Sequence, residues 1–236
     1  MQTYILMCLP TSTFTMFFRR DFKKCATVFV VIIAFISMKG GVGKSTLAAH
    51  AYSYAKRQGL NVWLVDMDAQ GSSSAWLDGN EENAQCYHIP KPADAVEAIK
   101  TRNADSDVVI VDGGGGLELA TKAGLMVADL AVIPTRASRI DYNATMEVLR
   151  LANQVRVERG RDAARVLVVP SMIMAGQLTT NQLLDELEEL EVPIGQPIHQ
   201  RSVFAKAAGD MNFVWDHKDS NAIAEVEMLM QSILEK

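Results

Sequence analysis

The segment Lys39-Gly-Gly-Val-Gly-Lys-Ser-Thr46 decides the fold of this 236-residue chain. It follows an apolar, β-branched run at Val30–Ser37 and leads into a helix-like stretch at Ser45–Gln58. Its glycines let the backbone turn successive N–H groups inward around an anion, and the start of the following helix adds free amides and a favourable dipole. A glycine-rich turn between a strand and a helix, ending in Lys-Ser, is typical of a phosphate-binding loop.

The residue types in this loop indicate a nucleoside triphosphate and Mg²⁺. We expect Lys44 to bridge the β- and γ-phosphates and the hydroxyl of Ser45 to bind the metal. The remaining residues would line the phosphates with backbone N–H groups. They are Gly40, Gly41, Val42, Gly43 and Thr46.

Apolar runs and helix-like stretches alternate along the rest of the chain, which predicts an α/β fold with a mostly parallel twisted sheet and helices on both faces. The predicted strands are Val30–Ser37, Asn61–Asp66, Asp107–Asp112, Leu130–Pro134 and Arg165–Pro170. The predicted helices are Ser45–Gln58, Leu117–Ala128, Asp141–Arg159, Thr180–Leu190 and Asn221–Glu235.

Carboxylates stand at or just beyond the ends of two of these strands. Asp66 and Asp68 end the second strand two residues apart, and Asp112 ends a strand of four apolar residues. The carboxyl ends of parallel strands face the ligand crevice of an α/β sheet. We therefore expect Asp112, and with it Asp66 in a supporting role, to hold Mg²⁺ together with Ser45.

Four glycines, residues 113–116, follow Asp112 directly. Without Cβ atoms this loop has a wide choice of backbone angles. It is therefore either a switch that reorders when the γ-phosphate is present or a simple flexible connection.

Composition limits the class of protein. The chain is 49% hydrophobic and 22% charged, which is typical of a globular domain. Residues 1–26 carry a charge of +3 and form an N-terminal extension, whereas 27–236 read as a single domain. The three cysteines are scattered and include no CxxC pair, so a disulfide framework or a cysteine metal site has no support.

The loop resembles the deviant Walker A motif, KGGxGK[ST], of the ParA/MinD superfamily within the SIMIBI-type P-loop NTPases. Met38 stands where the ordinary motif has glycine, and Lys39 is the additional lysine. Asp68, 24 residues after Lys44, ends a segment similar to the family's Walker A′ box. The resemblance implies that Lys39 contacts the ATP of a second subunit and that Asp68 orients the attacking water. It also implies that Pro134 begins a loop near the nucleotide.

The short length and the glycine-rich loop look most like the small ParA proteins of plasmid partition. That resemblance implies a weak, partner-stimulated ATP hydrolase, whose ATP-dependent homodimer binds nucleoid DNA without sequence preference. It implies a ParB-like or other cargo-adaptor partner and a cytoplasmic, nucleoid-associated protein. Arg201 and Lys206 match the family's basic C-terminal segment and are the candidate DNA contacts.

Other functions in the superfamily remain open or are disfavoured. Cluster carriers need paired cysteines, and membrane-binding relatives end in a basic amphipathic helix, whereas Glu225–Lys236 has three glutamates and one lysine. The same machinery could position a protein cargo such as carboxysomes or chemoreceptor clusters. A metabolic P-loop ligase or synthetase of the same fold is the other alternative.

The charge pattern leaves room for two kinds of partner surface. The net charge of −5 disfavours a dedicated nucleic-acid binder, but a local basic strip on a dimer would be sufficient for non-specific DNA binding. The segment Arg136–Arg165 contains seven arginines and four acidic residues, a local +3. It is either a solvated face with ion pairs or part of the surface that contacts DNA.

Overall fold

The computed structural model describes residues 31–80, 84–102, 106–116 and 118–234. The predicted N-terminal extension, 1–26, lies outside these residues. Within them, seven parallel strands form one sheet in the order β3-β2-β4-β1-β5-β6-β7. The strands are β1 (Val31–Phe35), β2 (Val62–Asp66), β3 (Cys86–His88), β4 (Val108–Asp112), β5 (Leu130–Thr135), β6 (Arg165–Ile173) and β7 (Ile198–His199).

Helices connect these strands and cover the sheet on both sides, as predicted. The α-helices are α1 (Lys44–Arg57), α2 (Ser72–Asn80), α3 (Pro92–Arg102), α4 (Glu118–Val127), α5 (Arg139–Arg159), α6 (Leu178–Glu188), α7 (Ser202–Gly209) and α8 (Ser220–Leu234). Two short 3-10 turns complete the described elements, η2 (Gly160–Asp162) and η3 (Val214–Asp216).

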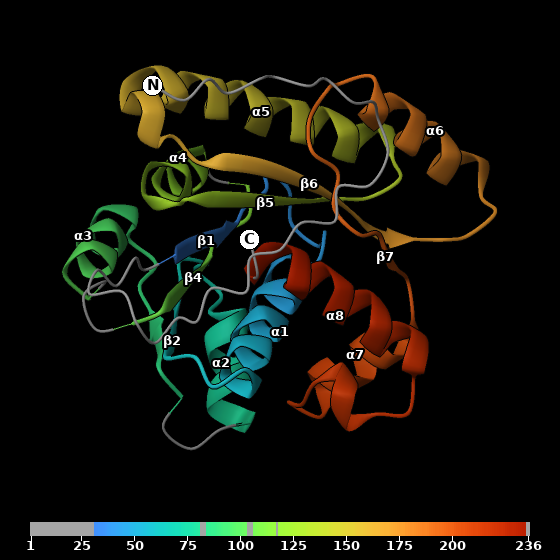
Figure 1. Ribbon diagram of the computed structural model, residues 1–236, viewed down its shortest axis with the longest axis horizontal. Coiled ribbons are helices and arrows are strands. Elements are labelled where there is room, and N and C mark those ends of the chain that lie inside the picture. Colours follow the sequence, from blue (N-terminus) through green and yellow to red (C-terminus); the bar gives the residue numbers. More distant parts are fainter. Residues whose placement is uncertain (1–30, 81–83, 103–105, 117, 235–236) are drawn as a thin grey trace, which may run out of the picture.

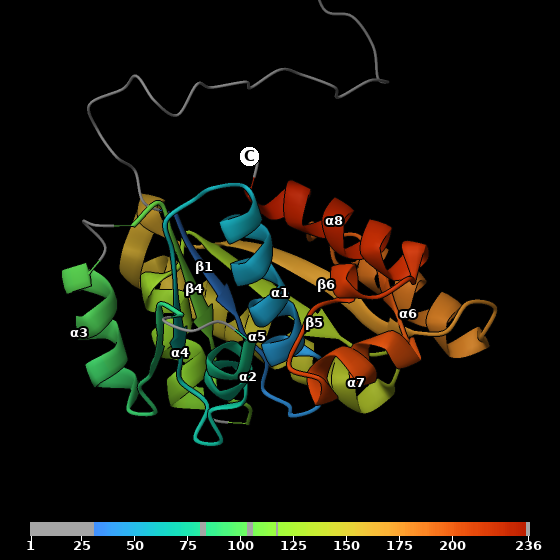
Figure 2. The same cartoon turned by 90° about the horizontal axis from the view of Figure 1, so that it is seen from below.

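Alternation along the central strands creates two separate cores. In β1, Ile33 and Phe35 face one core, whereas Ile32 and Ala34 face the other. Helices α1, α2, α7 and α8 pack on the first face and α3, α4, α5 and α6 on the second, as Figures 1 and 2 show from two directions. Both faces are covered, so a strand such as β1 is apolar along its whole length.

The five predicted strands and five predicted helices all exist, with boundaries that differ by at most three residues where the structure describes them. The prediction missed α2, α3, α7, β3 and β7. The two missed strands have three and two residues at the sheet edges, too short for a periodic signal. Helix α3 carried a readable signal, because Pro92 occupies its first turn and Ala95 and Ile99 are buried four residues apart.

The C-terminal helix packs on the core, as its apolar stripe predicted. Val226, Leu229 and Met230 are fully buried, and Ile233 is nearly so. Among the described residues, no helix is both long and apolar enough to cross a bilayer.

Candidate functional site

The glycine-rich loop connects β1 to α1 at the carboxyl edge of the sheet. Gly41 and Gly43 adopt φ angles of 75° and 94°, which side chains with a Cβ rarely adopt. Gly43 is the N-cap of α1, and its carbonyl accepts the N–H of Leu47. Val42 is buried and anchors the loop, whereas Gly40 and Gly41 are exposed. The open side of the loop is thus backbone, as a phosphate site requires.

The two lysines of the loop have different environments. Lys44 is buried, with 5% of its surface exposed, whereas the side chain of Lys39 remains 38% exposed. The Nζ atom of Lys39 lies 3.1 Å from Oδ1 of Asp141, a buried acid in the first turn of α5. Lys44 therefore belongs to the interior of the loop, and Lys39 lies at its rim.

The four-glycine loop packs closely against this site. A Cβ atom on Gly115 would lie 3.2 Å from Nζ of Lys44 and 3.4 Å from Cα of Gly40. A Cβ on Gly114 would lie 3.0 Å from the carbonyl oxygen of Met67. The backbone of Met67 at Gly114, and the side-chain tip of Lys44 at Gly115, therefore leave little space for a Cβ atom at these two positions.

Asp112 is a buried carboxylate beside the loop. Neither of its oxygens makes a hydrogen bond with the described residues. Burial, with the charge of Asp66 added, raises the pKa of Asp112 to about 7, and Ser45, Ser73 and Lys44 lie near enough to oppose this rise. An acid held without partners next to a serine hydroxyl fits a Mg²⁺ ligand, because a bound cation supplies the missing compensation.

Asp66 lies beside Asp112 in the register of β2 and β4 but has other partners. Its Oδ1 accepts the N–H of Asp68 at 2.9 Å, and its Oδ2 accepts the N–H of Ser74 at 2.9 Å. Asp66 thus joins the end of β2 to the first turn of α2. This geometry favours the supporting role that we expected over direct metal binding.

Asp68 links the loop after β2 to the glycine loop. Its Oδ2 accepts the N–H of Gly115 at 3.3 Å, and its Oδ1 accepts the N–H of Gln70 at 2.9 Å. The ring Nε2 of His88 donates to the carbonyl of Asp68 at 2.8 Å. The half-buried Asp68 is therefore held at the same edge of the sheet as Lys44 and Asp112.

Pro134 lies inside β5, so the expectation that it begins a loop is wrong. It pairs with Val169 of β6, and the strand continues to Thr135. The pairing of β5 with β1 ends at Val132, so the missing N–H of Pro134 breaks no bond on that side.

The candidate DNA contacts have unequal environments. Arg201 donates to Oε1 of Glu225 at 2.7 Å, and this hydrogen bond raises the pKa of Arg201. Burial acts to raise the pKa of Glu225, yet Arg201 and the backbone N–H of His199 hold it below its usual value. A phosphate contact by Arg201 would require this ion pair to open.

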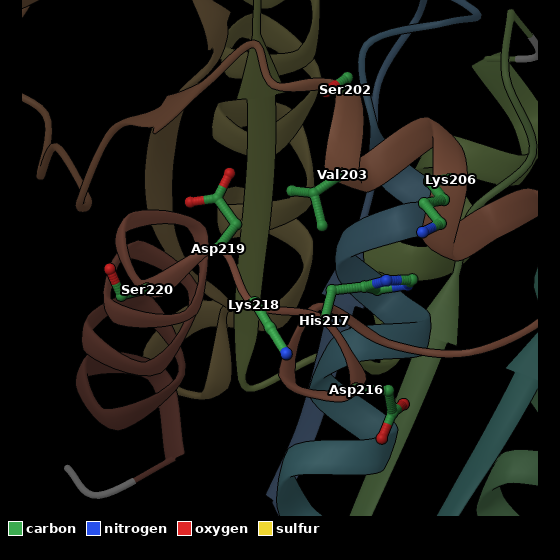
Figure 3. Close-up of a pocket in the computed structure, with 8 residues that line it drawn as sticks. All are labelled: Ser202, Val203, Lys206, Asp216, His217, Lys218, Asp219 and Ser220. Carbon is green, nitrogen blue, oxygen red and sulfur yellow. The ribbon is translucent and has the colours of Figure 1, made fainter.

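Lys206 is exposed on α7 and borders a hollow of about 730 Å³. Figure 3 shows Lys206, His217 and Lys218 around this hollow, which Asp216 and Asp219 also line. The acids offset the lysines, so the hollow itself is not strongly basic.

Sequence reasoning missed two residues of this site. Asp141 follows Ser138 with the spacing of a helix-capping box, and the Ser138 hydroxyl accepts the N–H of Asp141 at 3.1 Å. That spacing was a readable signal for the start of α5, although not for the contact with Lys39. Ser73 had no signal, because nothing in its sequence context indicates that it lies near Asp112.

Comparison with known proteins agrees with this geometry. The family model described as the CobQ/CobB/MinD/ParA nucleotide binding domain matches residues 33–213. Protein ParA of Rhizobium radiobacter is 30% identical over 141 residues, covering 59% of this chain and 63% of the relative. The chromosome-partitioning ATPase Soj of Thermus thermophilus is 27% identical over 155 residues, covering 52% and 62%. Both matches span less than two thirds of the relative's length.

A solved structure shows the same fold. A variant of Cyanothece McdA in complex with ATP superposes with a TM-score of 0.74 at 16% identity, covering 87% of this chain and 96% of that one. The family model covers most of the chain and includes the glycine-rich loop, Asp68 and Asp112. The chain therefore belongs to the CobQ/CobB/MinD/ParA family of nucleotide-binding proteins.

Proposed function

We propose that this chain is a ParA-type ATPase that partitions DNA, using ATP and Mg²⁺. The different environments of the two loop lysines carry the proposal. Lys44 is buried within the loop, whereas Lys39 lies at its rim with 38% of its side chain exposed. A second lysine at the rim can reach another subunit once it leaves Asp141. The partition relatives named ParA and Soj support this assignment.

The chain's own residues have separable roles at the nucleotide. The N–H groups of residues 40–46 bind the phosphates, and Lys44 neutralises charge that develops between the β- and γ-phosphates. Ser45 and Asp112 would hold Mg²⁺, which supplies further charge neutralisation when bound. Asp66 positions Asp68 through the backbone of the loop after β2.

Asp68 orients the water that attacks the γ-phosphate. The same carboxylate accepts the N–H of Gly115, so movement of the glycine loop would change the position of Asp68. This contact gives a physical route by which a partner bound near the loop could stimulate slow hydrolysis.

In this proposal, ATP closes a homodimer through Lys39, the dimer binds DNA without sequence preference, and hydrolysis releases it. An adaptor of the ParB type, bound to the cargo, stimulates hydrolysis. Lys206 is the first candidate for contact with DNA phosphates, because Arg201 is paired with Glu225, which also binds the ring of His199.

The experiment compares the wild type with Lys39→Ala in ATP and in ADP. Light scattering measures the mass, and fluorescence anisotropy measures binding to a 60-base-pair duplex of arbitrary sequence. We expect an ATP-dependent dimer that binds DNA in the wild type, and an ATP-binding monomer in Lys39→Ala. The control Lys100→Ala changes an exposed lysine on α3 and should behave as the wild type.

Two results would contradict the proposal. An unchanged ATP-dependent dimer in Lys39→Ala would exclude the role of Lys39 in a second subunit. A wild type that binds and hydrolyses ATP but never binds the duplex would favour the alternatives, a protein-positioning ATPase or a metabolic ligase or synthetase. A carboxylate or amide substrate that accelerates hydrolysis would distinguish the metabolic enzyme.

A further inference from the structure

A groove between α5 and the segment 190–193 gathers arginines that the nucleotide site does not use. One wall is formed by α5 from Met146 to Arg156, and the other by the segment 190–193 that follows α6. Val166 of β6 lies between them. The cavity measures about 680 Å³, which lies within the usual range for ligand-binding pockets.

The groove lies away from the phosphate loop. Arg165 is the first residue of β6 and lines the groove, whereas the phosphate loop follows the last residue of β1. In a parallel sheet, the first residue of one strand and the residue after the end of another lie at opposite ends of the strands. Figure 1 shows α5 running alongside β5 and β6. A ligand in the groove would therefore leave the nucleotide site accessible.

Four exposed arginines surround the groove and come from three elements: Arg150 and Arg156 from α5, Arg161 from η2 and Arg165 from β6. In the described part of the chain, none of these four guanidinium groups forms an ion pair or a hydrogen bond with another residue. The sole acid among the described lining residues is Glu191. This local positive charge stands against a net charge of −5 for the whole chain.

Other arginines of the same chain have partners in the fold. Arg139 pairs with Glu186 at 2.9 Å, and Arg159 donates to the carbonyls of Leu125 and Ala128. The four arginines of the groove thus differ from arginines that stabilise the domain. Their planar guanidinium groups are suited to paired hydrogen bonds with carboxylates.

The interior of the groove is apolar. Leu149, Val166, Leu190 and Val192 are half-buried and pack on the core below, leaving part of each side chain open to the groove. The wall at 190–193 is held to the sheet, because the N–H of Val168 donates to the carbonyl of Pro193 at 2.9 Å. The groove is therefore a preformed apolar surface with a cationic rim.

From these observations we propose that the arginine-rimmed groove binds an acidic amphipathic segment of a partner protein. The segment places two or three apolar side chains on Leu149, Val166 and Val192, and its Asp and Glu side chains pair with the four arginines. A DNA backbone would satisfy the arginines but has no apolar surface to cover the interior of the groove. Charge and apolar lining together favour the peptide.

The experiment selects peptides and then measures their affinities. A displayed library of random 16-residue peptides is selected on the full chain, and recovered peptides are labelled and titrated by fluorescence anisotropy. The test variant is Arg150→Glu with Arg156→Glu. The control is Lys91→Glu with Lys100→Glu, which makes the same change of charge at exposed sites near and on α3.

We expect recovered peptides to combine Asp and Glu with apolar residues at helical spacing. Their dissociation constants should rise at least tenfold in the arginine variant and less than twofold in the lysine control. Peptides without acidic residues, or equal affinities in both variants, would overturn the proposal. It would also be overturned if the arginine variant lost affinity for a 24-base-pair duplex and kept its affinity for the peptides, since the arginines would then serve nucleic acid.

Discussion

The ammonium of Lys39 lies 3.1 Å from the carboxylate of Asp141, which has only 3% of its side chain exposed. The same acid is held by Ser138, whose hydroxyl donates to its Oδ2 and accepts its backbone N–H. Asp141 is thus fixed at the start of α5, and the mobile partner of the pair is Lys39. Lys39, which we propose contacts a second subunit, therefore already has an ion-pair partner within its own chain.

This ion pair should oppose dimer formation, because Lys39 must leave Asp141 to reach a second subunit. We expect Asp141→Asn, which keeps an acceptor for Ser138, to raise the dimer fraction at limiting ATP several-fold. Light scattering across an ATP titration measures the effect. A dimer fraction equal to or below that of the wild type would show that Asp141 instead positions Lys39 productively.

Asp68 should affect hydrolysis far more than binding. We expect Asp68→Ala to lower the rate of ATP hydrolysis at least a hundredfold, because a water-orienting carboxylate is lost. Asp68→Asn keeps one acceptor oxygen, which can serve the N–H of Gln70 or of Gly115 but not both, so it is the closer structural match to the wild type. Both variants should accumulate the ATP-bound dimer, and normal turnover in Asp68→Asn would remove the carboxylate from the chemistry.

Asp112 should lower the stability of the metal-free protein and contribute to Mg²⁺ binding. Burial raises the pKa of Asp112 to about 7, so the ionised carboxylate lowers the stability of the folded protein at neutral pH and above. We therefore expect Asp112→Asn to raise the melting temperature of the nucleotide-free protein while weakening the Mg²⁺-dependent part of ATP binding. Calorimetry with and without Mg²⁺ separates the two effects. A lower melting temperature would mean that the carboxylate stabilises the empty site.

His50 should make the free energy of unfolding depend on pH. Its Nδ1 donates to the carbonyl of Thr46 at 2.7 Å, and its Nε2 accepts the N–H of Val214 at 3.2 Å. If Nε2 were protonated, its N–H would face the N–H of Val214, and neither group could accept a hydrogen bond. Rings of Trp76 and Trp215 enclose the imidazole at 5.6 and 5.3 Å between centroids, and burial lowers its pKa from 6.5 to about 4.

Because the folded pKa of His50 lies below the unfolded value, the unfolded chain binds more protons between these two values. The contribution of His50 to stability is full above pH 6.5 and falls by about 3 kcal/mol as the pH drops to about 4. Urea unfolding at a series of pH values measures this slope. His50→Gln should reduce the slope and His217→Gln should not; parallel slopes for all three proteins would refute the assignment.

Local sequence was sufficient for the phosphate loop and the central strands. The loop needs glycine at fixed spacing next to Lys44, and β1 and β4 are buried on both faces, so continuous apolar runs reveal them. Edge strands and short helices gave weaker signals. Residues 92–102 are an exception, since Pro92 in the first turn and the spacing of Ala95 and Ile99 made this helix readable.

Local sequence patterns did not predict contacts between segments that are distant in the chain. Arg201 matched a basic motif, yet its partner is Glu225 on α8, which only the packing of α8 beside β7 brings near. The family resemblance predicted that Pro134 begins a loop. In the structure, β5 extends beyond the end of its pairing with β1, so a proline fits within the strand at this position.

The sequence by itself determined the phosphate loop, the carboxylates at the strand ends and the parallel sheet. The loop and the carboxylates are recognised from residue types at short spacing, and the sheet from the alternation of apolar strands with helices. The tertiary structure alone decided that Lys39 meets Asp141, that Asp68 meets Gly115, and that four arginines surround an apolar groove. These contacts join residues far apart in the chain. Their positions depend on how strands and helices pack, and no local spacing encodes that.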